Sequence, residues 1–305
     1  MKELTAFIIV VAVTALIYIG VEPYAHFVMN PHVEPAQFNF VKADDEMKDE
    51  SIKNFWSEVN AIDLSKGDAA RGAEIIQMAG CTGCHGIKKA GIDNPMNPKT
   101  SVGGLSVAPA DLSNIAYLYD EKFLAGLIKD PAKAMKLTHK FNDENPFEMP
   151  AFFGAGGDLN EEIADIVAYL KSIAPKTMSD DAVFKEACVR CHDMKYAKMY
   201  PAGNKKEISK YLGTTPPDLS MYIRSRSTQY LNDFINDPQK MLAGTAMPRV
   251  GLKQSTQKQV LSFMSATGDS KKEERESLGY YLMGYFLILA IFATLWKRKI
   301  WEKLH

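Results

Sequence analysis

Two short motifs constrain the fold of this chain more than any other feature. Residues 80–86 read GCTGCHG and residues 188–193 read CVRCHD, so each motif holds two cysteines, two residues apart, and a histidine directly after the second. The chain of 305 residues has no other cysteine. Whatever it folds into must therefore present the same set of side chains twice.

The motifs belong to a longer internal repeat. Their first cysteines are 107 residues apart, and the same offset relates APADLS at 108–113 to TPPDLS at 215–220. It also relates FLAGLIKDP at 123–131 to YLNDFINDP at 230–238. One offset shared by three separate landmarks indicates two copies of a single domain.

Beyond these landmarks the copies differ in length. In the first copy a Met-Pro pair begins at Met149, 19 residues after Asp130. In the second copy the corresponding pair begins at Met247, only 10 residues after Asp237. The first copy therefore carries nine extra residues ahead of its Met-Pro pair.

Helices are expected on both sides of each motif. LNEEIADIVAYLKSI at 159–173 and QSTQKQVLSFMSA at 254–266 each place apolar residues on one helical face. Ahead of the motifs, GDAARGAEIIQMAG offers Asp68 as an N-cap, and SDDAVFKEA offers Ser179 or Asp180. The apolar residues expected on these faces are Ile163, Ile166, Val167 and Leu170 in the first copy and Val260, Leu261 and Met264 in the second.

The residue after the second cysteine separates the possible chemistries. A Cys-x-x-Cys pair alone serves zinc sites, thiol redox sites and disulfides. A structural zinc site takes four ligands that lie close together, and a thioredoxin-like site needs a βαβ setting that neither motif has. Cys-x-x-Cys-His is instead the attachment motif of c-type haem. We therefore expect two covalently bound haem c groups, held by Cys81, Cys84, Cys188 and Cys191, with His85 and His192 as axial ligands.

Methionine is the expected sixth ligand of each iron, because a thioether sulfur raises the haem potential relative to a second histidine. Met149 and Met247 occupy matching positions, each before a proline and before the closing helix. The alternative is that both are core residues and that Met135 or Met241 is the ligand. If His139 took the place of Met149, the first haem would be bis-histidine and lower in potential.

Each axial histidine also needs a partner for its other ring nitrogen, which is commonly a backbone carbonyl. Pro109 and Pro216 lie at matching positions before the DLS turn. A carbonyl near each proline is a candidate acceptor, and the alternative is that the prolines only shape the turn.

Two uncharged apolar runs lie near the chain ends. Residues 4–21 would span roughly 27 Å as a helix, close to the thickness of a bilayer core. Residues 278–296 have tyrosines near their start and a tryptophan at their end, as at membrane interfaces. Neither run has the polar stripe of an amphipathic core helix, which is the alternative. The first run could instead be a cleaved signal peptide, but no small-x-small site follows it.

Positive charge sets the expected orientation. Lys297, Arg298 and Lys299 follow the second run, and such residues remain on the cytoplasmic side. Both termini are then cytoplasmic, and the segment between the spans lies on the periplasmic side of a bacterial inner membrane. The net charge of −1 gives no field that favours nucleic acid.

The motif, the DLS turn, the Met-Pro pair and the closing helix resemble class I c-type cytochrome domains in both copies. That family folds as a small all-helical wrap around one haem. The second copy has Ser179 where the first has Gly72, and Phe263 where the first has Tyr169, so its terminal helices are expected to cross differently.

The resemblance implies an all-α protein with two tandem class I cytochrome c domains between an N-terminal and a C-terminal transmembrane helix. Residues 22–66, with three prolines and the charged run at 42–50, read as a linker with one short helix near SIKNFWSEVNAI. The expected parts are an N-terminal anchor (1–21), a periplasmic linker (22–66), cytochrome c domains (67–175 and 176–268), a juxtamembrane linker (269–277), a transmembrane helix (278–296) and a basic cytoplasmic tail (297–305).

The layout of the whole chain resembles the dihaem, cytochrome c1-like subunit of bacterial quinol:cytochrome c oxidoreductase, the cytochrome bc complex of respiratory chains. That resemblance implies a cytochrome b subunit and a Rieske iron–sulfur protein as partners in a dimeric complex. It also implies a relay of electrons from the Rieske protein to a soluble cytochrome c or a terminal oxidase. Such a subunit needs no catalytic residues of its own.

Three other classes remain open. The dihaem electron-entry subunit of a cbb-type cytochrome c oxidase would have membrane spans at the N-terminal end only. A dihaem peroxidase would leave one iron open or switchable. A membrane-tethered shuttle without a complex would need a single anchor.

Overall fold

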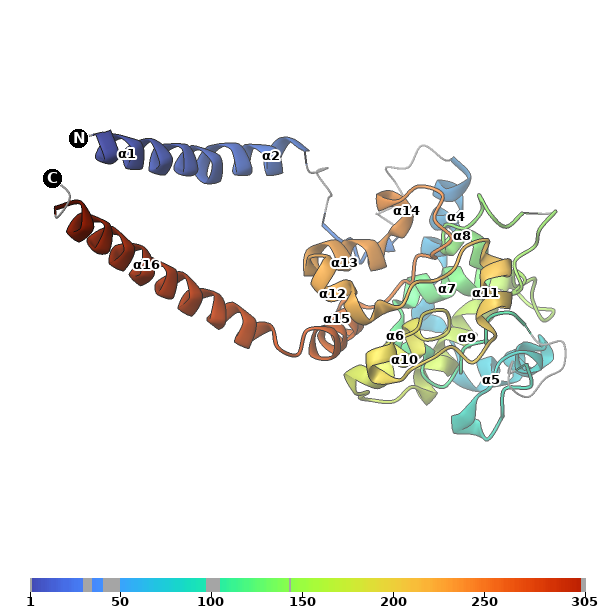
Figure 1. The fold of residues 1–305 in the computed structure, drawn as a ribbon. Helices are drawn as coiled ribbons and strands as arrows, with labels where there is room; N and C mark the ends of the chain where they lie inside the picture. Colours follow the sequence, from blue (N-terminus) through green and yellow to red (C-terminus); the bar gives the residue numbers. More distant parts are fainter. Residues whose placement is uncertain (1, 30–34, 41–49, 97–104, 143, 303–305) are drawn as a thin grey trace. The chain divides into compact units, whose positions relative to one another are not determined.

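The computed structural model describes residues 2–29, 35–40, 50–96, 105–142 and 144–302, and within these ranges the protein is helical with no β-strand (Figure 1). Three isolated bridges are the only strand-like pairings there. The expectation of an all-α fold is confirmed. The chain divides into two compact units, Met1–Ala36 and Gln37–His305, which are described separately.

The N-terminal unit is a run of helix that continues past the expected anchor. It consists of α1 (Lys2–Ala15), the π-helical segment η1 (Leu16–Val21) and α2 (Glu22–Met29). Pro23 lies in the first turn of α2, directly after the π-helical turn. Proline disrupts the bonding of a continuous α-helix, and π-turns and prolines are both common causes of local irregularity. The stretch Leu4–Ala25 is long and apolar enough to cross a membrane.

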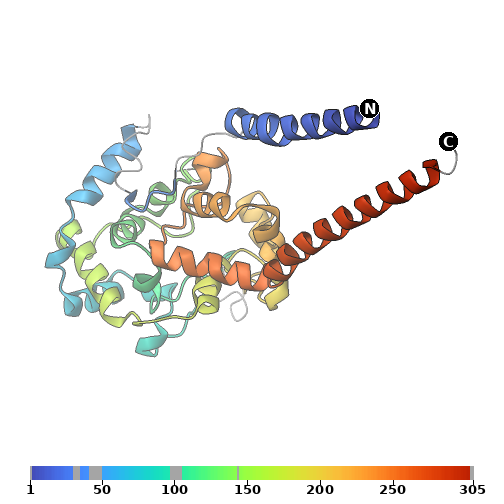
Figure 2. The same ribbon diagram turned by 90° about the vertical axis from the view of Figure 1, so that its left-hand side faces the viewer.

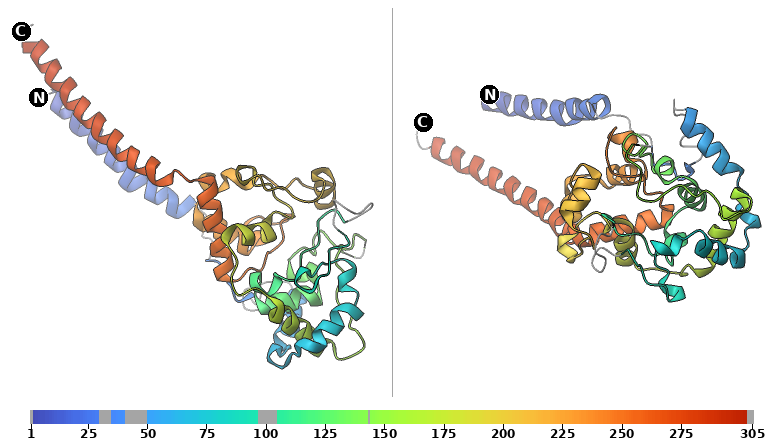
Figure 3. Two further views of the ribbon diagram at one scale, coloured as in Figure 1. Left: turned by 90° about the horizontal axis from the view of Figure 1, so that it is seen from below. Right: turned by 90° about the vertical axis from the view of Figure 1, so that its right-hand side faces the viewer.

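The C-terminal apolar run lies within α16 (Lys272–Glu302), the second helix long and apolar enough to span a membrane. Figures 2 and 3 show it as one uninterrupted helix. Because α16 begins at Lys272, most of the expected linker at 269–277 is the first part of this helix. The expected basic tail likewise begins inside α16, and its residues 303–305 lie outside the described residues.

The first copy is built on two crossing helices, α5 (Ala69–Met78) and α9 (Leu159–Ile173). Asp68 caps α5 as expected, since its side chain accepts hydrogen bonds from the amides of the first turn. Gly72 lies against the backbone of Asp165 in α9, which only a residue without a side chain allows. The predicted face of α9 is buried throughout.

The second copy uses α10 (Asp180–Cys188) and α15 (Gln254–Gly268), and these helices meet differently. Ser179, the counterpart of Gly72, is the residue before α10 begins, so α10 has no turn equivalent to the first turn of α5. Contact comes instead from the rings of Phe184 and Phe263, whose centroids are 4.8 Å apart. The two helix pairs thus meet through different residues, Gly72 in the first copy and two phenylalanine rings in the second.

Shorter elements connect these helices. In the first copy they are η2 (Leu64–Lys66), η3 (Cys81–Gly83), η4 (Lys88–Ala90), α6 (Ile115–Leu118), α7 (Glu121–Lys129) and α8 (Pro131–Ala134). In the second they are η5 (Lys195–Ala197), α11 (Lys205–Leu212), η6 (Leu219–Met221), α12 (Tyr222–Ser225), α13 (Thr228–Asn236) and α14 (Pro238–Met241). α8 and α14 each begin with the proline of a matching Asp-Pro pair.

Part of the expected linker belongs to the core. The helix expected near SIKNFWSEVNAI is α4 (Glu50–Ala61), which buries Ile52, Phe55, Trp56 and Val59. The ring of Trp56 packs on Gly126 in α7, which explains the absence of a side chain there. Residues 41–49, most of the charged run, lie outside the described residues.

The two copies pack against each other within one unit. Tyr119 pairs with Leu252 in an antiparallel bridge, and the Thr256 hydroxyl donates to the carbonyl of Leu118 at 2.7 Å. Both contacts join the loop and helix after Met247 to the end of α6 and the residue that follows it. The two copies therefore form one packed unit and are not separate domains joined by a flexible linker.

A buried ion cluster lies at this junction. The Asp237 carboxylate accepts from the Lys136 ammonium at 2.6 Å and from the Arg249 guanidinium at 2.7 Å. Arg249 is 1 % exposed, and its guanidinium lies over the ring of Phe40. Two cations from different copies are thus held by one carboxylate in a nearly dry environment.

We predict that Gly72→Ala lowers the free energy of unfolding by roughly 1–3 kcal/mol, the usual cost of forcing extra atoms into a packed contact. The added methyl group would lie directly against the Asp165 carbonyl and 2.9 Å from the Tyr169 Cβ. Denaturant unfolding measures the effect. Glu74→Ala, on the exposed side of the same helix, is the control and should change little; equal losses would contradict the helix contact.

We also predict that Asp237→Asn costs about 3–5 kcal/mol at neutral pH, because it leaves buried cations without their carboxylate. Burial raises the pKa of Asp237, but Arg249 and Lys136 outweigh it, so the net pKa lies below the ordinary 3.8. The wild-type protein is therefore more stable than Asp237→Asn by the full amount above pH 3.8. This difference in stability disappears as the pH falls through the lowered pKa.

Unfolding of both proteins between pH 7 and pH 2 tests this. Glu121→Gln, which removes a half-exposed pair with Lys171 (2.9 Å), should cost no more than about 1 kcal/mol. A difference between wild type and Asp237→Asn that stayed constant down to the lowest pH would show that the carboxylate charge is not the cause.

Candidate functional site

Both Cys-x-x-Cys-His motifs fold into the same tight turn. The amide of His85 donates to the Cys81 carbonyl at 2.9 Å, and the amide of His192 donates to the Cys188 carbonyl at 3.0 Å. The turn thus places each histidine over the first cysteine of its motif. All four thiols are free and partly exposed, so each motif presents two thiols that are available for covalent attachment.

A backbone carbonyl holds each histidine ring. The Nδ1 atom of His85 lies 2.8 Å from the Ala110 carbonyl oxygen, and that of His192 lies 2.8 Å from the Pro217 carbonyl oxygen. Because a carbonyl only accepts, Nδ1 carries the proton and Nε2 keeps its lone pair for a metal. The acceptors come one residue after Pro109 and Pro216, so both prolines lie beside the carbonyl rather than supplying it.

The DLS segments fix these carbonyls in place. The carboxylates of Asp111 and Asp218 accept from the amide three residues after each histidine, at 3.4 and 3.3 Å. The hydroxyls of Ser113 and Ser220 accept from the next amide, at 3.0 and 3.1 Å. Sequence reasoning used these residues only as repeat landmarks. They recur at the same sequence separation from both motifs, and this repetition could have indicated that they position the site.

Burial sets the protonation of the site. It lowers the pKa of His85 and of His192, although the carbonyl bond opposes this in both cases. It raises the pKa of Cys188 to about 12 and raises that of Cys81 and of Cys191. Thiol exchange requires a thiolate, and redox cysteines have lowered pKa values. The geometry therefore suits neutral imidazole ligands and does not suit a dithiol redox centre.

The two motifs interact electrostatically. Besides burial and its carbonyl, the guanidinium of Arg190, inside the second motif, contributes to the lowered pKa of His85 in the first. Burial raises the pKa of Tyr119, and the guanidinium of Arg190 partly opposes this rise. A residue of the first copy is thus within electrostatic range of the second attachment turn.

The two predicted methionine ligands lie in different surroundings. Met247 packs on the hydrophobic core, and its amide is 3.3 Å from the Thr245 hydroxyl. Met149 is half-buried and follows Glu148, whose amide donates to the Tyr211 hydroxyl at 3.2 Å. Their role as ligands stays a prediction.

The alternative ligands are placed as follows. Met135 also packs on the core, and its carbonyl accepts from the Arg249 amide at 3.1 Å. Met241 is half-buried at the end of α14, and His139 is exposed. Across the described residues, no three Cys, His, Asp or Glu side chains gather as a metal cluster.

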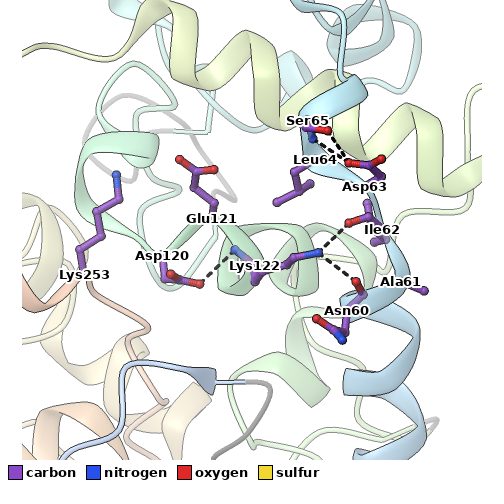
Figure 4. A pocket seen from close by; sticks show the side chains of 10 residues that line it. All are labelled: Asn60, Ala61, Ile62, Asp63, Leu64, Ser65, Asp120, Glu121, Lys122 and Lys253. Atoms are coloured by element: carbon purple, nitrogen blue, oxygen red, sulfur yellow. Dashed lines mark hydrogen bonds between the residues drawn. The ribbon is translucent and has the colours of Figure 1, made fainter.

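A surface hollow lies between α4, α7 and the start of α15, but it carries none of the motif residues (Figure 4). The Lys122 ammonium donates to the carbonyls of Asn60 and Ile62, and Asp120 caps α7. These polar groups of the hollow therefore stabilise the surrounding backbone. The hollow is lined by Asn60, Ala61, Ile62, Asp63, Leu64, Ser65, Asp120, Glu121, Lys122 and Lys253.

A helical wrap around a Cys-x-x-Cys-His turn with a carbonyl-bound histidine is typical of c-type cytochrome domains. Residues 69–174 match the family model described as Cytochrome c. The chain thus contains a cytochrome c domain, whose family binds haem c covalently and transfers electrons. The four free thiols and the two Nε2 atoms fit that group.

A solved structure described as a hyperthermophilic respiratory Complex III is similar to part of the chain. The match covers 41 % of this chain and 75 % of that one, at 19 % sequence identity and a TM-score of 0.32. So low a score does not establish a common fold. No curated protein matches the chain.

We predict that Met149→Leu and Met247→Leu each remove the sulfur-to-iron absorption band of one oxidised haem and lower its reduction potential. Redox titration followed by absorption spectroscopy checks this. Met135→Leu and Met241→Leu are the matched controls and should keep both bands. Loss of a band in either control would assign the ligand to that residue instead.

Proposed function

We propose that the chain is a membrane-anchored dihaem c-type cytochrome, the electron-relay subunit of a quinol:cytochrome c reductase. In this role it takes electrons from a Rieske iron–sulfur protein and passes them to a periplasmic cytochrome c or an oxidase. The observation that carries the proposal is the repeated site: the turn, the histidine bond and its distance recur 107 residues apart.

Each group of side chains has a defined task in the relay. Cys81 and Cys84 in the first copy, and Cys188 and Cys191 in the second, form the thioether bonds. Covalently bound haem supplies a one-electron iron couple. The carbonyls of Ala110 and Pro217 keep each imidazole in the tautomer whose Nε2 can bind iron. Because the protein only positions these groups, no acid, base or nucleophile is required.

The packing of the copies supports a relay within one subunit. The bridge between Tyr119 and Leu252 and the bond from Thr256 to Leu118 hold the copies in a fixed register. Arg190 in the second motif lies within electrostatic range of His85 in the first. A rigid body with neighbouring sites favours repeated one-electron transfer between them.

The apolar helices support attachment to a membrane that also holds the partners. Leu4–Ala25 and α16 each have the length and composition of a span. With the basic residues after the second run on the cytoplasmic side, the sites face the periplasm of a bacterial inner membrane. A cytochrome b subunit in a dimeric complex would provide the quinol site.

We predict that the wild-type protein binds two haems per chain, and that Cys81→Ala/Cys84→Ala and Cys188→Ala/Cys191→Ala each retain one covalent haem. The reason is that each motif supplies its own thioether bonds. Pyridine haemochrome assay and intact mass measure the stoichiometry. If the Cys81→Ala/Cys84→Ala variant folded but bound no haem, the two motifs would not be independent sites.

The complex itself is tested by purifying the native protein from membranes in mild detergent. Inhibitor-sensitive quinol:cytochrome c reductase activity with b-type haem and a Rieske protein is the expected result. A haem–copper oxidase subunit without a Rieske protein would instead place the chain in a cbb-type oxidase.

A further inference from the structure

We propose that the second copy carries a docking surface for an acidic electron-transfer protein, formed by Tyr196, Lys198, Tyr200 and Met221. We call these four residues the second-copy patch. The inference rests on the proposed function, because it assigns the second motif as the site that exchanges electrons with a protein partner.

The patch exposes three large, mostly apolar side chains, and two of them are in contact. Tyr196 is 59 % exposed, Tyr200 is 56 % exposed and Met221 is 44 % exposed. The Tyr196 hydroxyl lies 2.9 Å from the Met221 sulfur, so η5 and η6 present a joint surface. Grouped exposed apolar side chains with a polar surround mark interaction sites more often than single ones do.

The first copy has no such surface at the matching place. The residues 107 positions earlier are Lys89, Asp93 and Asn114, all polar. Among the described residues of the first copy, the exposed large apolar side chains are Met78 and Phe153, which lie in α5 and in the loop after Met149. Two copies with the same local backbone thus differ in the side chains that they offer to a partner.

Charge around the patch identifies the kind of partner. Residues 194–206 contain four lysines and no carboxylate. Lys195 and Lys205 pair with carboxylates, whereas Lys198 and Lys206 are exposed at the surface. Exposed lysines beside an apolar surface attract an acidic partner and speed its association.

The backbone at Lys198 is an independent observation. Lys198 has φ 55°, and its counterpart Gly91 has φ 73°. A residue with a side chain is strained in this left-handed region, whereas glycine is not. Strain at a surface residue is a reason to look for function there. The second copy keeps a lysine where the fold alone would favour glycine.

The patch lies on the structure that holds the axial histidine. Tyr196 is four residues after His192, and its amide donates to the Ser220 hydroxyl at 3.1 Å. Pro217, whose carbonyl binds His192, lies four residues before Met221. A partner on the patch would therefore contact the two chain segments that orient the imidazole.

Stopped-flow reduction of the full-length protein in nanodiscs tests the proposal. The probes are photoreduced flavodoxin, a small acidic protein, and lumiflavin semiquinone, a small uncharged reductant. Lys198→Gly should lower the flavodoxin rate constant several-fold at low salt and little at high salt, with the lumiflavin rate unchanged. Its unfolding midpoint should be unchanged or higher, which a merely structural lysine would not produce.

Two further variants sharpen the result. Tyr196→Ser/Tyr200→Ser should lower the flavodoxin rate at both salt concentrations, since an apolar contact is not screened. Lys89→Ser, which removes a lysine at the first-copy position matching Tyr196, should have no effect. Equal losses in Lys89→Ser and Lys198→Gly would overturn the proposal by showing diffuse attraction, as would unchanged rates in all variants.

Hydroxyl-radical footprinting in the same nanodiscs separates a protein partner from a lipid surface. Tyr196 and Tyr200 should react freely alone and be protected when flavodoxin is added. Protection by the nanodisc alone would assign the patch to the membrane and overturn the proposal. Haem is counted in the same preparations: two haems with no patch effect rejects this inference only, whereas one haem also rejects the proposed function.

Discussion

The hydrogen bond between each motif histidine and a backbone carbonyl is the constraint on which the site depends. It fixes the tautomer, the direction of the ring and the distance between the motif and the DLS turn. An aspartate and a serine then tie that turn back to the residues just after the histidine, with nearly equal distances in both copies. A closed loop of polar contacts of this kind can be copied intact while the helices around it change.

The helices around it have in fact changed. The first copy brings α5 and α9 into backbone contact at Gly72, whereas the second relies on two phenylalanine rings and a shorter α10. The copies also share a junction in which Asp237 holds cations from both sides. Independent packing inside each copy and joint packing between them give one rigid body with two similar sites.

The sequence was sufficient for features that depend on local pattern. The helix at 159–173 was predicted with its observed bounds, because its apolar residues recur at helical spacing. The Asp68 cap was predicted from the type and position of that residue before the helix. The packing of α4 on α7 was not foreseen, since a short amphipathic helix in a linker does not reveal its partner.

Long-range contacts could not be predicted either. Nothing in the sequence connects Lys136 to Asp237, which are 101 positions apart, or indicates that Arg249 would be buried. The acceptor carbonyls were found within one residue of the expected prolines, because the repeat had already located the turn. The assignment of Met149 and Met247 as iron ligands remains a prediction from their matching positions in the sequence.

The packing of α4 has a consequence for the limits of the cytochrome c domain. The family match begins at residue 69, yet the aromatic side chains that cover α7 come from upstream, at Phe40, Phe55 and Trp56. The unit that folds is thus larger than the unit that the family shares. Phe40 and α4 thus form part of the wall of the cytochrome core, so α4 cannot be removed or replaced without exposing the protein interior.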